Sequence, residues 1–202
     1  MTAEIERMLR EGAGALDAGP APDLSGVAAE AGLLDVAYAT EETPVGEVLL
    51  ASTPRGLVRI AYLGGELPGG LDSVLGDLAT RLSPRVLEAP VRLDPVRREL
   101  DEYFEGRRRK FGLTLDLGLV RGFGLRVLET ALAIPFGDVL TYGEVATRAG
   151  SPRAARAAGN ALGANPIPIV VPCHRVVHAG GGLGGYTGGL DRKRALLAVE
   201  GR

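Results

Sequence analysis

The stretch TYGEVATRAGSPRAARAAGNALG, residues 141–163, predicts two short helices joined by a glycine turn. Thr141 is a good N-cap for the first helix, and Gly150 is a suitable residue to end it. Ser151 and Pro152 then supply a cap and a first-turn proline, so we expect the second helix to begin there. Two helices in this arrangement are typical of a helix-turn-helix, which many DNA-binding proteins use.

The second predicted helix is rich in alanine, and Arg153 and Arg156 lie one turn apart in it. A helix that reads base edges in the major groove normally exposes Asn, Gln, Arg or Ser. A face of small residues instead permits close approach, which suits a shallow or narrow groove and binding without sequence preference. The composition gives equal support to the alternative that these alanines pack against a neighbouring helix.

The segment before this stretch has the pattern of a small sheet. Short β-prone runs separated by turn residues predict three strands joined as antiparallel hairpins. A helix, a fourth strand and a second helix with one apolar face are expected to follow. In chain order these elements fall near residues 36–39, 45–51, 56–62, 71–82, 86 and 95–105.

These patterns divide the chain into three parts and predict an α+β fold. Residues 1–34 are expected to be an extension that is flexible or holds one short helix over 2–10, because glycines and prolines follow. A strand-rich domain with a small antiparallel sheet covers 35–117, and a mostly helical domain covers 118–202. The linker is placed at 118–124. A core-facing helical stripe follows it, formed by Phe123, Val127, Leu128, Ala131 and Leu132.

The charge is distributed unevenly along the chain. The formal net charge is only −2, which by itself argues against a nucleic-acid partner. Residues 1–120, however, carry 13 Lys and Arg against 20 Asp and Glu, whereas residues 121–202 carry 10 against 5. An anionic partner is therefore expected to meet the second part of the chain.

Cys173 is the single cysteine, and it lies in an unusual context. An aliphatic run over 167–171 leads into it, and a glycine-rich loop over 180–189 follows. One cysteine excludes an intramolecular disulfide and a multi-cysteine zinc site. With no signal segment and no membrane-spanning run, we expect a soluble, cytoplasmic protein without a membrane partner.

A cysteine is nucleophilic as its thiolate, so Cys173 needs a base or a positive environment. His174 is adjacent, but neighbouring side chains of an extended segment point to opposite faces. A bridging water or a turn at this point would solve the geometry. Glu200 is a candidate to orient His174, because residues 190–200 are expected to form a helix that returns to the core. The alternative is that Cys173 is an inert core residue.

Ordered blocks of sequence around Cys173 resemble those of the O6-alkylguanine-DNA alkyltransferases, also called methylated-DNA–protein-cysteine methyltransferases. The resemblance covers the second domain and, more loosely, the first from about Val36. It implies a ribonuclease H-like first domain and a winged helix-turn-helix-like second domain. The blocks are residues 134–137, 141–146, 154–157, 165–169, 172–176, 185–190 and 196–201.

The resemblance also implies the catalytic roles. Cys173 accepts the alkyl group, His174 deprotonates it through a water, and Glu200 polarises His174. Asn165 braces the active-site turn. Tyr142 assists nucleotide flipping and gives a proton to the leaving guanine.

The remaining implied site residues bind DNA or form the pocket. Arg156 resembles the finger that enters the duplex and takes the place of the flipped nucleotide. The other DNA-binding residues are Thr141, Ala154, Ala155 and Gly159, and the pocket residues are Leu162, Pro168, Val176, Tyr186 and Thr187.

The implied activity is DNA repair in a single turnover, in which the alkyl group moves irreversibly to Cys173. The resemblance further implies a monomer that binds double-stranded DNA through the minor groove and associates with the nucleoid during repair. We expect no cofactor and no metal, because no Cys or His precedes Cys173. Leu128 stands where many members carry tryptophan. The alternatives are a non-catalytic DNA-binding regulator or lesion sensor and, with less support, a thiol hydrolase with a Cys-His-Glu triad.

Overall fold

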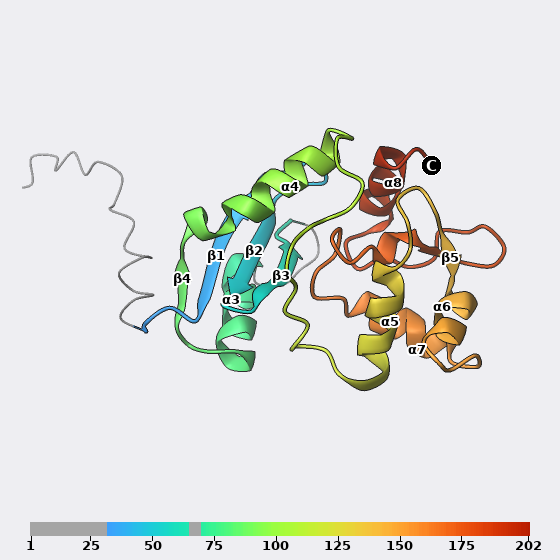
Figure 1. Cartoon of the computed structure of the whole chain (residues 1–202), viewed down its shortest axis with the longest axis horizontal. Helices are drawn as coiled ribbons and strands as arrows, with labels where there is room; N and C mark the ends of the chain where they lie inside the picture. Colours follow the sequence, from blue (N-terminus) through green and yellow to red (C-terminus); the bar gives the residue numbers. More distant parts are fainter. Residues whose placement is uncertain (1–31, 65–69) are drawn as a thin grey trace, which may run out of the picture.

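The computed structural model describes residues 32–64 and 70–202. The helix expected over residues 2–10, and most of the extension expected over 1–34, lie outside the described residues. Figure 1 shows a sheet with helices α3 and α4 in one half of the molecule and helices α5 to α8 in the other. No helix in the described parts of the chain is long and apolar enough to cross a membrane.

The first half is built on a four-stranded sheet with the strand order β3-β2-β1-β4. Strands β1, β2 and β3 are antiparallel hairpins, as predicted. The fourth strand pairs parallel to β1, with Val36 opposite Val86, so the sheet is mixed and not antiparallel throughout. The chain crosses through a helix before β4, and such a crossover allows parallel pairing. The strands are β1 (Val36–Glu41), β2 (Val48–Thr53), β3 (Gly56–Tyr62) and β4 (Val86–Glu88).

One helix packs against each of the two faces of this sheet. Side chains alternate along each strand, so Leu49 and Val58 pack with Val74 and Leu78 of α3 (Gly70–Arg81). The opposite face packs against α4 (Asp94–Phe104), which follows the short 3₁₀ helix η1 (Pro90–Leu93). Both helices agree with the predictions to within one residue at each end. Val96, Leu100 and Tyr103 form the buried face of α4.

The second half consists of four α-helices, one 3₁₀ helix and one pair of short strands. Residues 127, 128 and 131 are buried on α5, as the helical stripe predicted, but Leu132 is 37% exposed. Strands β5 and β6 are parallel and place residue 141 beside residue 177. The elements are α5 (Gly122–Leu132), β5 (Leu140–Thr141), α6 (Tyr142–Arg148), α7 (Ala155–Gly163), η2 (Cys173–Arg175), β6 (Val176–Val177) and α8 (Leu190–Val199).

The cap of α6 agrees with the prediction, whereas the start of α7 does not. The Thr141 side chain accepts a hydrogen bond from the Glu144 amide, and Glu144 bonds back to the Thr141 amide, which is a capping box. We expected the second helix to begin at Ser151, but α7 begins at Ala155. The Ser151 amide donates to the carbonyl of Ala146 at the end of α6, and the Ala154 amide donates to the carbonyl of Ser151, so residues 151–154 form a turn before α7.

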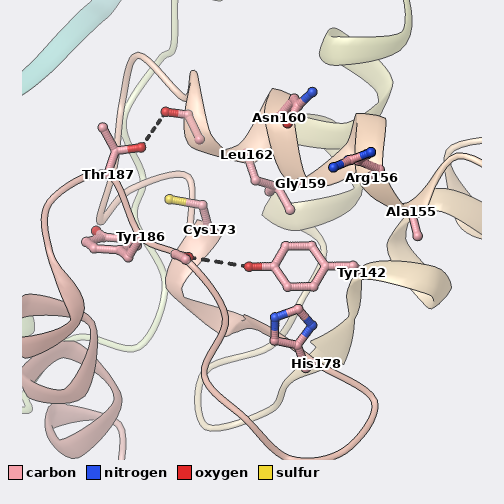
Figure 2. A pocket seen from close by; sticks show the side chains of 12 residues that line it. Tyr142, Ala155, Arg156, Gly159, Asn160, Leu162, Cys173, His178, Tyr186 and Thr187 are labelled. Carbon is pink, nitrogen blue, oxygen red and sulfur yellow. Dashed lines mark hydrogen bonds between the residues drawn. The ribbon is translucent and has the colours of Figure 1, made fainter.

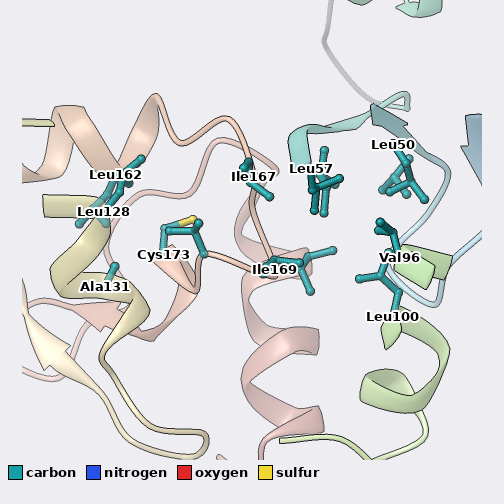
Figure 3. Packing of buried hydrophobic residues seen from close by; sticks show 14 of the residues in the cluster. Leu50, Leu57, Val96, Leu100, Leu128, Ala131, Leu162, Ile167, Ile169 and Cys173 are labelled. Atoms are coloured by element: carbon teal, nitrogen blue, oxygen red, sulfur yellow. The ribbon is translucent and has the colours of Figure 1, made fainter. Parts of the chain in front are cut away.

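One hydrophobic cluster joins the two halves (Figure 3). Leu50 and Leu100 from the sheet side and Leu128 from α5 belong to the same cluster as Ile167 and Ile169. Complete burial of a leucine or isoleucine side chain contributes roughly 1.5–3 kcal/mol. The segment that leads to Cys173 is therefore held by packing from both halves of the molecule.

Candidate active site

Cys173 opens a 3₁₀ helix, η2, which turns the chain immediately after Pro172. The residue is 7% exposed. Ile169, four residues earlier, has φ of 72°, and no other non-glycine residue in the described parts of the chain has positive φ. A β-branched residue adopts this conformation only where its surroundings impose it. The segment was expected to be extended, with a bridging water or a turn as the two ways to bring His174 and Cys173 together, and a turn is present.

The Asn165 side chain makes hydrogen bonds to the segment before Cys173 and to Cys173 itself. Its Nδ2 donates to the carbonyl oxygen of Val171 at 2.8 Å and to Cys173 Sγ at 3.2 Å. Its Oδ1 accepts from the amide of Ile167 at 3.0 Å. One amide side chain therefore fixes the segment before Cys173 and contacts the sulfur itself.

His174 is fully buried and points away from the solvent. Its Nε2 lies 2.9 Å from Oε1 of Glu200, the residue that ends α8. Its Nδ1 is buried and has no hydrogen-bond partner within the described residues. Burial lowers the pKa of His174, although Glu200 opposes this shift. A neutral ring that donates from Nε2 to Glu200 leaves the Nδ1 lone pair available as a base.

Glu200 is the centre of a buried polar cluster. Arg175 donates from Nε and Nη2 to both carboxylate oxygens, and Tyr103 donates to Oε1 at 2.8 Å. The Gly137 amide donates to Oε2 at 3.2 Å. Burial alone would raise the pKa of Glu200, but the hydrogen bonds from His174 and Arg175 outweigh it and lower the pKa to about 2. The carboxylate is therefore ionised and holds His174 in one orientation.

Burial raises the pKa of the Cys173 thiol, and three side chains, together with a backbone hydrogen bond at Cys173 itself, act against that shift. These are the hydrogen bond from Asn165, the charge of Lys193 and the hydroxyl of Tyr186. The Lys193 side chain is fully buried, and its Nζ donates to the carbonyl oxygens of Val176 and Leu183. The resting thiol is protonated, so attack by Cys173 requires a base.

A cavity of about 670 Å³ opens beside Cys173 (Figure 2). Helix α7 forms one wall, and the loop that contains Tyr186 forms the opposite wall. The Thr187 hydroxyl donates to the carbonyl of Gly163 at 2.5 Å and joins these two walls. The lining residues are Tyr142, Ala155, Arg156, Gly159, Asn160, Leu162, Gly163, Cys173, His178, Gly185, Tyr186 and Thr187.

Tyr142, the first residue of α6, projects into this cavity between α7 and the loop (Figure 2). Its hydroxyl donates to the carbonyl of Gly185 at 3.4 Å, and its ring lies 5.2 Å from the His178 ring. Burial raises the pKa of Tyr142, so the hydroxyl keeps its proton near neutral pH. A Cβ at Gly184 would lie 2.5 Å from the Tyr142 hydroxyl oxygen, so the loop can pass here only with glycine.

The structure places most predicted site residues around the cavity, but not all of them. Eight predicted residues line it: Tyr142, Ala155, Arg156, Gly159, Leu162, Cys173, Tyr186 and Thr187. Pro168 and Val176 are buried and do not line the cavity, and Thr141 and Ala154 precede α6 and α7. Asn165, His174 and Glu200 lie behind the Cys173 turn.

Several residues of the site were not predicted. Asn160 and His178 line the cavity, Arg175 and Tyr103 complete the buried cluster around Glu200, and Lys193 is buried with its Nζ on the carbonyl oxygens of Val176 and Leu183. The position of Tyr103 on the apolar face of a predicted helix is consistent with burial, but nothing in its local sequence indicates Glu200 as its partner. The described residues contain no group of three or more His, Cys, Asp or Glu suited to hold a metal ion.

Comparison with protein families assigns both halves of the chain. Residues 36–117 match the family model described as 6-O-methylguanine DNA methyltransferase, ribonuclease-like domain. Residues 122–202 match the model described as 6-O-methylguanine DNA methyltransferase, DNA binding domain. The two matches agree with the family that the sequence blocks resemble.

Individual relatives carry the same assignment. The methylated-DNA–protein-cysteine methyltransferase of Mycobacterium tuberculosis strain H37Rv is 52% identical over 104 residues, which are 50% of this chain and 61% of that protein. The match thus spans less than two thirds of the mycobacterial relative. The enzyme of the same name from Methanosarcina acetivorans is 36% identical over 164 residues, 81% of this chain and 97% of that protein.

Solved structures give the same result for the fold. The crystal structure of Mycobacterium tuberculosis OGT in complex with DNA has a TM-score of 0.68 and 37% identity, and the match covers 81% of this chain and 92% of that one. The O6-methylguanine-DNA methyltransferase from Pyrococcus kodakaraensis has a TM-score of 0.57 and 28% identity, over 83% and 99% of the two chains. The chain therefore belongs to the O6-alkylguanine-DNA alkyltransferase family.

Proposed function

We propose that this protein repairs DNA by transferring an alkyl group from O6 of guanine to its own Cys173 in a single turnover. The observation that carries the proposal is the position of the thiol. Cys173 lines the same cavity as Ala155, Arg156 and Gly159, which belong to the second helix of the helix-turn-helix. A volume of about 670 Å³ lies in the range of small-molecule sites and accommodates one extruded base.

The first step is extrusion of the damaged nucleotide, because O6 of guanine is out of reach of a thiol inside the stacked duplex. Arg156 is exposed in the first turn of α7 and takes the place of the base in the stack. Ala154, Ala155 and Gly159 allow close approach of the DNA backbone, and Thr141 lies at the adjacent start of α6. We assign Leu162, Tyr186 and Thr187 to the walls of the base pocket. Pro168 and Val176 are buried next to these walls, and we assign them to the backbone that supports the pocket.

The second step is attack by Cys173. His174 Nδ1 takes the thiol proton through a water, and Glu200 keeps the imidazole oriented. The sulfur forms a bond to the alkyl carbon while the bond from that carbon to O6 breaks. Tyr142 supplies a proton to the departing guanine. The proton that His174 received returns to Tyr142 through solvent, so a thiol and an O6-alkylguanine become a thioether and guanine.

The thioether product ends the reaction, because a thioether offers no leaving group for hydrolysis at neutral pH. This distinguishes the proposal from the thiol hydrolase alternative, which requires turnover. The lesion-sensor alternative is less well supported, because the cysteine and the buried His174–Glu200 pair are both in place.

We further propose that the protein binds double-stranded DNA as a monomer through the minor groove and associates with the nucleoid while it repairs. The alanine-rich start of α7 supports the minor groove, since small residues permit close approach in a narrow groove. The M. tuberculosis relative solved in complex with DNA supports the partner. The division into an extension over 1–34 and domains over 35–117 and 118–202 belongs to the same proposal.

The test is transfer from a duplex that contains one O6-methylguanine. Incubation under reducing conditions is expected to add one methylene unit of mass to the peptide that contains Cys173, with at most one equivalent per protein. Cys173→Ser and an unmethylated duplex are the controls. Absence of the modified peptide would refute the proposal, and product in excess of one equivalent would favour a hydrolase.

A further inference from the structure

A second cavity, of about 570 Å³, lies against the segment that carries Cys173. It shares no lining residue with the active-site cavity. Val170, Pro172 and Arg175 form one wall. The connection from α4 to α5 forms another wall, and the residues that follow α5 complete the cavity. Its volume lies in the range of small-molecule sites.

The interior of the second cavity is apolar and partly aromatic. Phe111 and Phe136 line it, and both rings contact Tyr103, with ring centres 5.3 and 6.1 Å away. Leu132, the last residue of α5, also lines the cavity and is 37% exposed. Apolar surface of this kind gains free energy when a ligand removes it from water. The interior therefore suits a ligand with an apolar body.

The charged side chains of the second cavity are all cationic. Its lining contains Arg109, Lys110 and Arg175, and it contains no Asp or Glu. The charge of Arg175 is neutralised, because its guanidinium donates to both oxygens of the Glu200 carboxylate. Arg109 and Lys110 are exposed, and their side chains have no carboxylate partner within residues 32–64 and 70–202. Two positive charges therefore remain beside the apolar interior.

The arginines that precede Arg109 are arranged differently. Arg107 pairs with Glu105, and Arg108 pairs with Glu102 at 2.7 Å, so both charges are compensated within the chain. The Arg109 guanidinium instead lies over the Phe136 ring, 5.7 Å from its centre, at the edge of the cavity. A planar guanidinium in this position can donate two parallel hydrogen bonds to a carboxylate, sulfonate or phosphate.

We propose that the second cavity binds a small amphipathic anion, a compound with an aromatic or branched apolar body and one carboxylate, sulfonate or phosphate group. The apolar body enters between Phe111, Leu132 and Phe136, and Arg109 and Lys110 bind the anionic group at the edge. This ligand site is separate from alkyl transfer, since neither its charges nor its apolar lining belong to the active-site cavity.

The first test uses anilinonaphthalene sulfonate, an aromatic anion that fluoresces in apolar sites, and phenylnaphthylamine, which has the same rings without the sulfonate. Arg109→Gln is expected to lower the affinity for the sulfonate about fivefold, the loss of one hydrogen-bonded contact, and to leave the affinity for the neutral compound unchanged. Arg107→Gln is the matched control and should bind both probes as the wild type does, because Arg107 does not line the cavity. Equal sulfonate affinities for the wild type and Arg109→Gln would overturn the proposal.

The second test places a negative charge in the cavity without changing the size of the side chain. Leu132→Glu and Leu132→Gln both shorten the apolar surface at a partly exposed position, but only the first adds a carboxylate that competes for the two cations. The sulfonate is expected to bind Leu132→Glu about fivefold more weakly than Leu132→Gln. The neutral probe should bind the two variants equally. Equal sulfonate binding by both variants would contradict the proposal.

A third variant locates the probe, because the active-site cavity is also partly apolar. Arg156→Gln removes the cation that lines the active-site cavity and should leave the sulfonate affinity unchanged. Loss of affinity in Arg156→Gln, with none in Arg109→Gln, would place the probe beside Cys173 and reject the second cavity as its site. These titrations involve neither DNA nor transfer to Cys173, so a failure of the proposed alkyl transfer leaves their outcome unaffected.

Discussion

The Tyr103 hydroxyl donates a hydrogen bond of 2.8 Å to Oε1 of Glu200, although 97 residues separate them. Tyr103 belongs to α4, which packs on the sheet, and Glu200 ends α8 and holds His174. The first half of the molecule therefore supports the carboxylate on which the orientation of His174 depends.

Removing this hydroxyl is expected to cost stability. Tyr103→Phe keeps the packed ring but withdraws one donor from a buried carboxylate, so the free energy of unfolding should fall by about 1–3 kcal/mol. Urea unfolding at pH 7 measures the change. Tyr38→Phe provides the control, and equal unfolding midpoints for the two variants would contradict the prediction.

Acid is expected to destabilise the protein through Glu200. The pKa of this group is about 2 in the folded protein against 4.5 for a free glutamate. The unfolded chain therefore takes up the proton first as the pH falls, so this contribution is complete above about pH 5 and is lost toward pH 2. The loss is on the order of 3 kcal/mol. A carbon-13 NMR titration should find the carboxylate still ionised at pH 4, and a midpoint near 4.5 would disprove the assignment.

Arg156 is expected to matter for duplex DNA and little for the free base. Arg156→Ala removes the side chain that replaces the extruded nucleotide, so transfer from a duplex should slow by about tenfold or more. Transfer from free O6-methylguanine needs no extrusion and should be nearly unchanged. Arg153→Ala is the control, because Arg153 is exposed before α7 and does not line the cavity. Equal losses on both substrates would argue against the flipping role.

Lys193 is expected to favour the thiolate of Cys173. Lys193→Met keeps the length of the side chain but removes a buried positive charge near the sulfur, so the pH midpoint of Cys173 alkylation by iodoacetamide should rise. Arg194→Met is the matched control, because Arg194 is exposed on the same helix. A folded Lys193→Met protein with the wild-type midpoint would exclude an electrostatic role.

Most helices and strands could be predicted from the sequence because the interactions that form them join residues close together in the chain. Thr141 caps α6 through its own side chain, and the apolar stripe of α5 buries Val127 and Ala131. The start of α7 was missed for a related reason. Ser151 has the composition of a cap, but the Ala154 amide donates to its carbonyl and closes a turn ahead of α7, which the local composition does not reveal.

Long-range partners were beyond the reach of local patterns. The parallel pairing of Val36 with Val86 depends on how a helix returns the chain to the sheet. Tyr103 and Glu200 are 97 residues apart in the chain, and only the folded structure brings them together. The turn at Cys173 was one of two alternatives left open, beside a bridging water, because the sequence shows that Cys173 and His174 are adjacent but not how the backbone bends between them.

Cys173 belongs both to the wall of the cavity and to the hydrophobic cluster that joins the two halves of the molecule. In the proposed reaction, each repair event enlarges the Cys173 side chain in the folded protein, because the thiol becomes a thioether. Enlarging a residue in a packed interior typically costs about 1–3 kcal/mol, whereas open space beside it accommodates the added group. Cys173 borders both environments, so the unfolding midpoint of the alkylated protein, compared with that of the unreacted protein, reports which side of the residue receives the alkyl group.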